Sequence, residues 1–213
     1  MFSSKNRTKS TLLSGTHDLT ELFTFEVAMY WALEGRHVFY ITPTPLESIP
    51  AKYHDRNSLV VESFQMVQFM YLKDYEALIS VLVGFHSHHI RPEVLLIDKL
   101  DTYIRHPKVT GQMLHTHIAK LCAILHDTMN ACSNMSKSQW EFHLLASVTP
   151  QNLTKSCYHL YFDQIWKLGR ENHKSFHLIR SGNSLELREV FEYQKFNDGT
   201  LILQKILQKL DNT

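Results

Sequence analysis

The sequence predicts an α/β fold: a doubly wound, mostly parallel sheet with an antiparallel extension at its carboxyl end. Apolar segments of strand length alternate with segments of helical period over the first 150 residues. Residues 94–97 form a continuous apolar run, which is typical of a parallel strand buried on both faces. Beyond residue 160, short strand-like segments separated by turn residues replace the helices. Strand–helix alternation followed by hairpins favours this architecture.

In the first part of the chain, each expected element has a local signal. The expected strands cover residues 11–15, 37–42, 66–72, 93–98 and 142–148. The expected helices cover residues 18–34, 74–86 and 114–132. Gly35 stands just past the first helix, and Pro43 closes the second strand. The last helix carries an apolar stripe at spacings of three and four, made of Leu114, Ile118, Leu121, Leu125, Met129 and Cys132.

The tail is expected to add four short strands, at residues 164–168, 175–180, 185–193 and 201–206. The pair Asp198-Gly199 favours a tight hairpin between the last two. We expect residues 11–213 to form a single domain, because no repeat or low-complexity linker divides them. Residues 1–10 contain Lys5, Arg7 and Lys9 and no acid, and are expected to be a flexible basic arm.

Composition bounds the class of protein. Hydrophobic residues make up 44% of the 213 positions, which is ample for a packed core. A formal net charge of +1 excludes a strongly basic nucleic-acid coat. The three cysteines form no CxxC pair, which favours a reducing compartment. No apolar run reaches the roughly 18 residues that span a bilayer, so we expect an intracellular protein.

The first strand–helix turn is where such a fold binds phosphate. The phosphate-binding motif G-x-x-x-x-G-K-[ST] combines backbone amides that wrap the phosphates, a lysine that neutralises them and a hydroxyl that holds magnesium. The segment from Gly15-Thr16 to Leu22 has the right length and place, but only Gly15 matches. Thr20 replaces the second glycine, Glu21 the lysine and Leu22 the hydroxyl residue.

These three replacements work against a triphosphate. Thr20 resists the positive φ angles that glycine tolerates, and Leu22 offers magnesium no ligand. Glu21 turns an attraction into a repulsion of about 4 kcal/mol per unit-charge pair, at about 4 Å and an effective dielectric near 20. The sequence therefore predicts a degenerate phosphate loop and no cofactor, with ATP and magnesium expected only if the loop still functions. The alternative is that Gly15 is only a strand-end turn.

Two later residues are candidate relics of a nucleotide site. Asp98 ends the strand 93–98, where the acid of a mononucleotide site reaches magnesium or orders water. Gln151 follows the strand 142–148, where a polar residue can sense a terminal phosphate. The alternative readings are a loop-capping acid and a simple turn residue. No residue is a firm catalytic candidate.

Several segments together resemble the RecA-family recombinase paralogues, in particular the ATPase-like subunit that partners a SWIM-type zinc-finger protein in the animal Shu complex. The segment Pro45-Leu46-Glu47-Ser48-Ile49-Pro50 is the most specific, because a generic RecA-like fold does not need it. The other matching segments are Leu12-Leu13-Ser14-Gly15-Thr16, residues 37–42, Val67-Gln68-Phe69-Met70-Tyr71, residues 94–104, Gln151 and residues 196–202.

The resemblance implies a RecA-like fold and a nuclear role in homologous-recombination DNA repair. Family members bind single-stranded DNA, pair with the SWIM-type protein and help the recombinase filament to form or persist. Members with an intact loop are DNA-stimulated ATPases. The departures at Thr20, Glu21 and Leu22 put the ATPase activity in question and leave the scaffold role intact. No Cys/His array matches a SWIM finger here, so zinc would belong to the partner.

Basic residues near the two ends are candidates for phosphate contacts with DNA, with a solvated surface as the alternative. They are Lys5, Arg7, Lys9, Lys167, Arg170, Lys174, Arg180 and Arg188. The helix 18–34 is apolar nearly all round, so we hypothesise that Phe25 and Met29 meet a partner subunit, with core packing as the alternative. The histidines at 86–89 and 115–117 lack Cys or carboxylate partners at metal-site spacing, so no metal is expected.

Three functions remain open. The leading hypothesis is a pseudo-ATPase scaffold that holds a partner and engages DNA or the recombinase filament. The second is a working ATPase with an atypical phosphate loop and Asp98 on magnesium. The third is a RecA-fold interaction domain with no DNA role.

Overall fold

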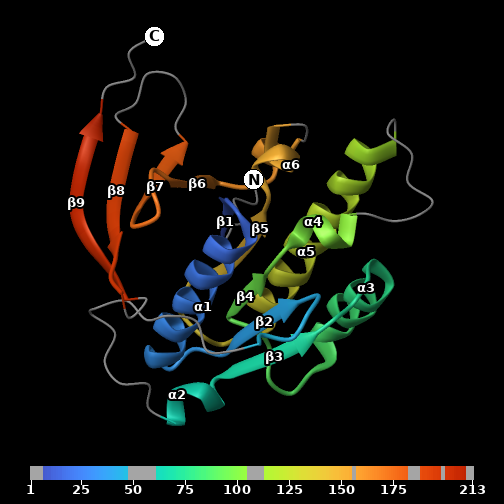
Figure 1. Ribbon diagram of the computed structural model, residues 1–213. Helices are drawn as coiled ribbons and strands as arrows, with labels where there is room; N and C mark the ends of the chain where they lie inside the picture. Colours follow the sequence, from blue (N-terminus) through green and yellow to red (C-terminus); the bar gives the residue numbers. More distant parts are fainter. Residues whose placement is uncertain are drawn as a thin grey trace.

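The computed structural model describes residues 7–47, 61–104, 113–154, 157–181, 188–197 and 200–209. Within these ranges nine strands form one mixed sheet, in the order β3-β2-β4-β5-β1-β6-β7-β8-β9 (Figure 1). The strands are β1 (Thr8–Ser14), β2 (Val38–Thr42), β3 (Val67–Tyr71), β4 (Val94–Ile97), β5 (Phe142–Val148), β6 (Gln164–Arg170), β7 (Ser175–Ser181), β8 (Arg188–Lys195) and β9 (Leu201–Lys209). The helices are α1 (His17–Leu33), α2 (Val61–Gln65), α3 (Tyr75–Gly84), α4 (Leu100–Ile104), α5 (Leu114–Met135) and α6 (Pro150–Thr154).

The pairing of the strands confirms the predicted α/β class. Strands β1 to β6 pair in parallel, whereas β6 to β9 pair as antiparallel neighbours. The antiparallel part stands to the left of α1 in Figure 1 and curves away from the parallel part. Every long predicted element is present. The five-residue helices α2, α4 and α6 were not predicted, because they are too short to show a period.

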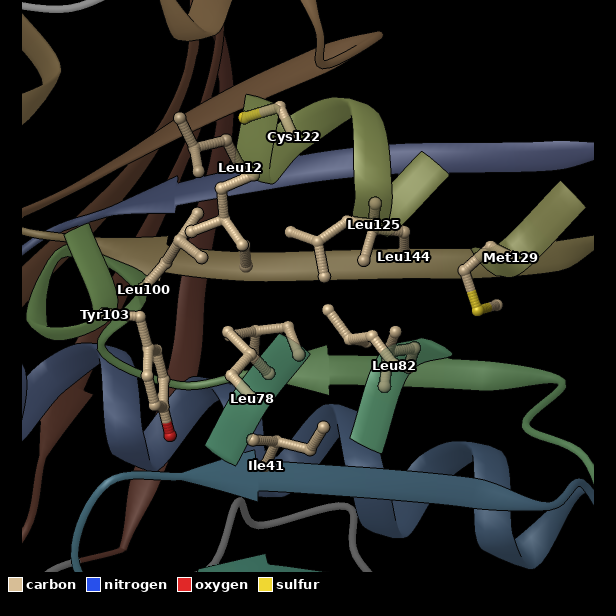
Figure 2. Close-up of a cluster of buried hydrophobic side chains, with 14 of the residues drawn as sticks. Leu12, Ile41, Leu78, Leu82, Leu100, Tyr103, Cys122, Leu125, Met129 and Leu144 are labelled. Carbon is tan, nitrogen blue, oxygen red and sulfur yellow. The ribbon is translucent and has the colours of Figure 1, made fainter. Parts of the chain in front are cut away.

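Helices cover both faces of the sheet, and the side chains of β2 and β4 alternate between them. On one face, Phe39 and Leu95 pack with α3, α4 and α5. Figure 2 shows part of this cluster, in which leucines of α3 and α5 point toward Leu12, Ile41 and Leu144 of the strands. On the other face, Val38, Tyr40, Val94 and Leu96 pack against α1. This two-sided burial explains the continuous apolar run of β4.

Helix α1 is more deeply buried than the partner hypothesis required. Phe25 and Met29 are 1% and 0% exposed and belong to the core, so neither can contact a partner in this fold. That hypothesis was wrong, because β2, β3 and β4 cover one side of the helix while β6, β7 and β9 cover another. The exposed apolar residues of α1 are instead Tyr30 and Leu33, near its carboxyl end. Gly35 follows with φ 76°, as its predicted place past the helix requires.

The basic arm is shorter than expected. Strand β1 begins at Thr8, and Lys9 lies opposite His143 in the parallel pair with β5. Residues 1–6, including Lys5, lie outside the described residues, as do the Asp198-Gly199 turn and residues 48–50 of the segment that begins at Pro45. In the described ranges, every helix is too short or too polar to cross a bilayer.

At the amino ends of the parallel strands, Trp31 of α1 stacks on His143 of β5, with ring centroids 4.5 Å apart. Burial and the charge of Arg36 lower the pKa of His143 to about 4 from its usual 6.5, against an opposing contribution from Glu141. The unfolded chain therefore binds a proton near pH 6.5, whereas the folded chain resists it down to about pH 4.

We predict that this histidine makes the fold acid-sensitive. Its contribution to the free energy of unfolding is complete above about pH 6.5 and falls as the pH drops toward about 4, by at most about 3 kcal/mol. The variant His143→Phe keeps an aromatic ring beside Trp31 but has no proton to bind. Urea unfolding from about pH 7.5 to about pH 4 should show a smaller loss of stability in the variant than in the wild type. Parallel pH curves would refute the assignment.

Candidate nucleotide site

The predicted phosphate loop is a short turn that leads directly into a helix. Only Gly15 and Thr16 separate β1 from α1, so Thr20, Glu21 and Leu22 lie within the helix. The backbone carbonyl of Thr16 accepts hydrogen bonds from the amides of Leu19 and Thr20, at 3.0 and 2.9 Å. Thr20 is fully buried, and its hydroxyl donates to the carbonyl of His17 at 3.3 Å. These two amides are therefore not available to wrap a phosphate.

Gly15 has a packing role at this turn. A Cβ atom at position 15 would lie 2.8 Å from Cβ of Leu168 in β6 and 3.2 Å from Cγ2 of Thr20. The Gly15 amide donates to the carbonyl of Val148 at 3.1 Å. Glycine is thus needed so that β1 can turn into α1 in close contact with β6, whether or not a phosphate ever binds.

Asp98 lies where the sequence placed it, at the carboxyl end of β4, and it is fully buried. Its Oδ1 accepts a hydrogen bond of 2.8 Å from the hydroxyl of Ser147 at the end of β5. Its Oδ2 accepts from the hydroxyl of Thr42 at the end of β2, at 3.4 Å. The carboxyl ends of three parallel strands thus converge on one carboxylate, as they do at the ligand-binding edge of open α/β sheets.

Lys99, which the sequence reasoning did not single out, completes this cluster. Its ammonium Nζ lies 2.7 Å from Oε2 of Glu21 and 3.6 Å from Oδ2 of Asp98. Its backbone amide donates to the Ser147 hydroxyl at 2.8 Å. With φ of 55°, Lys99 is the described non-glycine residue that adopts a left-handed conformation, which is uncommon for a side chain of this kind. The surrounding hydrogen bonds hold it there.

Electrostatics at this edge favour a charged lysine. Burial lowers the pKa of Lys99, but the hydrogen bond to Glu21 and the charge of Asp98 outweigh it and raise that pKa overall. Burial raises the pKa of Asp98, against the lowering effects of the Ser147 hydrogen bond and the Lys99 charge. Glu21, which stands at the position of the motif's lysine, therefore acts as the main counter-ion of an internal cation. The signal in the sequence was the lysine directly after the strand-end acid.

A second polar cluster surrounds the predicted sensor position. Asp101 of α4 is 3% exposed, and its Oδ2 accepts from the amide and hydroxyl of Thr149 and from the side-chain amide of Asn152. These bonds measure 3.1, 2.7 and 2.7 Å and anchor the start of α6. Gln151 is exposed on that helix, so the buried contacts at this end belong to its neighbours. Asp101 was not recognised because an acid after a strand is usually a loop residue.

The candidate DNA-binding residues do not form one cluster. Arg170 pairs with Asp18 at 2.8 Å and lies over the ring of Phe176, whereas Lys167 and Lys174 are exposed. Arg180 is half-buried in β7, opposite Trp166 in the register with β6. Arg7 and Lys9 lie at the other edge of the sheet, at the start of β1. Lys5 and the side chain of Arg188 lie outside the description.

No family model and no curated protein matches this chain. Among solved structures, it is similar to a DnaB-like replicative helicase, described with its interactions with primase, at a TM-score of 0.62 and 11% identity. The match covers 94% of this chain and 58% of the helicase chain. The chain is also similar to a second solved structure, an isolated ATPase domain, at a TM-score of 0.58 and 11% identity. That match covers 94% of this chain and 86% of the other.

The fold is RecA-like. The RecA-like sheet brings Glu21, Asp98 and Lys99 to the carboxyl edge at which ATPase domains of this fold hold their nucleotide. At 11% identity the likeness shows the fold alone, and this chain spans little more than half of the helicase chain.

We predict that Lys99→Met destabilises the protein by about 2 kcal/mol, because it leaves the carboxylates of Asp98 and Glu21 without their cation. The loss is smaller than for a fully buried pair, since the Glu21 side chain is 30% exposed. Lys73→Met is the matched control: it removes a lysine that is 87% exposed and paired with Asp74 at 3.9 Å, and should change stability by less than about 0.5 kcal/mol. Equal effects of the two variants on urea unfolding would contradict the role given to Lys99.

Proposed function

We propose that this chain is a RecA-like scaffold in homologous-recombination DNA repair that neither binds nor hydrolyses ATP. In this role it pairs with a SWIM-type zinc-finger protein in the nucleus, binds single-stranded DNA and promotes assembly or stability of the recombinase filament. The observation that carries the loss of ATPase activity is the ion pair between Lys99 and Glu21, 2.7 Å long, at the edge where a nucleotide would bind.

The chemistry of this edge supports a site without nucleotide. A triphosphate needs free amides, a mobile lysine and a magnesium ligand. Here the turn amides of Leu19 and Thr20 are bonded to Thr16, and the ammonium of Lys99 is held by two carboxylates. Binding a phosphate would require that Lys99 leave its counter-ions and that the negative Glu21 lie beside the phosphate.

Support for the DNA and partner roles is of a different kind. The resemblance to the SWIM-associated recombinase paralogues carries the partner, the filament and the nuclear location. The RecA-like fold is compatible with all three. Two exposed lysines of the carboxyl-terminal half, Lys167 and Lys174, supply positive charge for phosphate contacts.

The second candidate is a working ATPase with an atypical loop. It is favoured by the buried Asp98, which keeps the strand-end position of a magnesium-site acid and is surrounded by the hydroxyls of Thr42 and Ser147. In that case magnesium would bind near Asp98, and Lys99 would move toward the phosphates.

A nucleotide titration separates these two functions. We predict that calorimetry of the purified chain with ATP and magnesium gives a dissociation constant above about 1 mM, equivalent to less than about 4 kcal/mol of binding. Asp98→Asn should leave this result unchanged, because no magnesium depends on the carboxylate. Tight ATP binding that requires magnesium and is lost in Asp98→Asn would overturn the scaffold proposal and establish the ATPase.

Co-expression tests the partner. We predict that the chain purifies in a fixed ratio with a SWIM-type zinc-finger protein, and that the complex persists in about 0.5 M salt, where the Debye length is only about 4 Å. A SWIM-type protein whose zinc ligands are replaced is the matched control and should not co-purify, because the zinc belongs to the partner. Failure of the intact pair to co-purify would refute the family assignment.

A further inference from the structure

A cluster of aromatic and cationic side chains lies at the amino ends of the parallel strands, the edge opposite the candidate nucleotide site. Trp140 precedes β5, Arg36 precedes β2 and Trp31 lies near the end of α1. The guanidinium carbon of Arg36 is 4.7 Å from the ring centroid of Trp31 and 5.8 Å from that of Trp140. Arg36 thus bridges a half-buried indole and an exposed one. None of these three residues has a part in the closed site around Lys99.

The Trp140 side chain is unusual because it is 62% exposed although it lies on a fixed base. Arg36 beneath it is only 4% exposed and is held by the carbonyl of Glu141 and by Glu93, 3.9 Å away. The Trp140 amide donates to the Ser138 hydroxyl at 3.1 Å. An exposed indole held in this way loses little conformational freedom when a flat ligand stacks on it.

Positive charge borders this indole. Arg7 donates to the Ser138 carbonyl at 2.8 Å, and among the described residues it has no carboxylate partner. Lys9 is 3.9 Å from Glu141, with both side chains more than half exposed, so that pair is weak. Lys137 is exposed in the same loop as Trp140. From Arg7 the chain continues into residues 1–6, which add Lys5 and no acid.

We propose that Trp140 is a stacking platform for a base of single-stranded nucleic acid, with Arg7 and Lys9 contacting the adjoining phosphates. Aromatic side chains beside a basic track are how proteins bind single strands without sequence preference. The choice of nucleic acid rests on the proposed function, which requires single-strand binding but does not say where. The basic chain end that leaves the fold beside Trp140 favours a polyanion over a protein partner.

The test is fluorescence anisotropy of a labelled oligothymidylate titrated with the full chain and with variants. Trp140→Ala should weaken binding about 10-fold, since stacking of one base contributes roughly this factor. Trp140→Phe, which keeps a ring, should recover part of the affinity. Leu160→Ala is the matched control: it truncates a side chain that is 71% exposed and belongs to no such cluster, and it should bind like the wild type. Thermal unfolding verifies that all variants fold.

The outcomes separate this inference from the proposed function. If the wild type binds the oligonucleotide and Trp140→Ala binds equally well, the platform is refuted while single-strand binding stands. If the double variant Lys167→Glu and Lys174→Glu alone loses affinity, the DNA surface lies on the carboxyl-terminal strands instead. If the wild type does not bind, the DNA role itself fails. If Trp140→Ala abolishes co-purification with the SWIM-type protein but not oligonucleotide binding, the platform is a protein surface.

Discussion

The contact between Lys99, Glu21 and Asp98 constrains the whole carboxyl edge of the sheet. It joins α1 to the end of β4, and the hydrogen bonds of Ser147 and Thr42 extend it to β5 and β2. A buried carboxylate such as Asp98 needs a cation or hydrogen-bond donors, and here the chain supplies both. An internal ammonium thus neutralises the acids in a place where a bound cation would otherwise be needed, which is why a RecA-like sheet can persist without nucleotide.

The rest of the architecture is compatible with that closed edge. Because α1 starts two residues after β1, its buried residues reach β2 and β4 on one side and β6 and β7 on the other. Gly15 permits this by letting Leu168 approach. An open phosphate loop would interpose more chain between β1 and α1. The packing of α1 and the loss of the loop are therefore two aspects of one arrangement, while the opposite edge keeps an exposed indole at Trp140.

Much of the fold was predictable, because burial on both faces of a parallel sheet leaves a continuous apolar run, as in β4. The same rule misled the reading of α1. Its apolar residues on several sides suggested a partner, but the curved antiparallel strands cover one of those sides, and nothing local to residues 17–33 reveals this. At the site, Asp98 was identified from its place at a strand end. Lys99 and Asp101 were missed because their partners, Glu21 and Thr149, lie 78 and 48 residues away in the chain.

The sequence by itself determined the order and type of the long elements and the loss of the phosphate-loop residues at positions 20–22, because both depend on neighbouring residues and their period. Only the tertiary structure decided which charges meet. The ammonium of Lys99 against Glu21, and the guanidinium of Arg36 between Trp31 and Trp140, join residues from different elements. Such pairs form because parallel strands bring their like ends to one edge of the sheet, a long-range consequence of strand order that no local pattern contains.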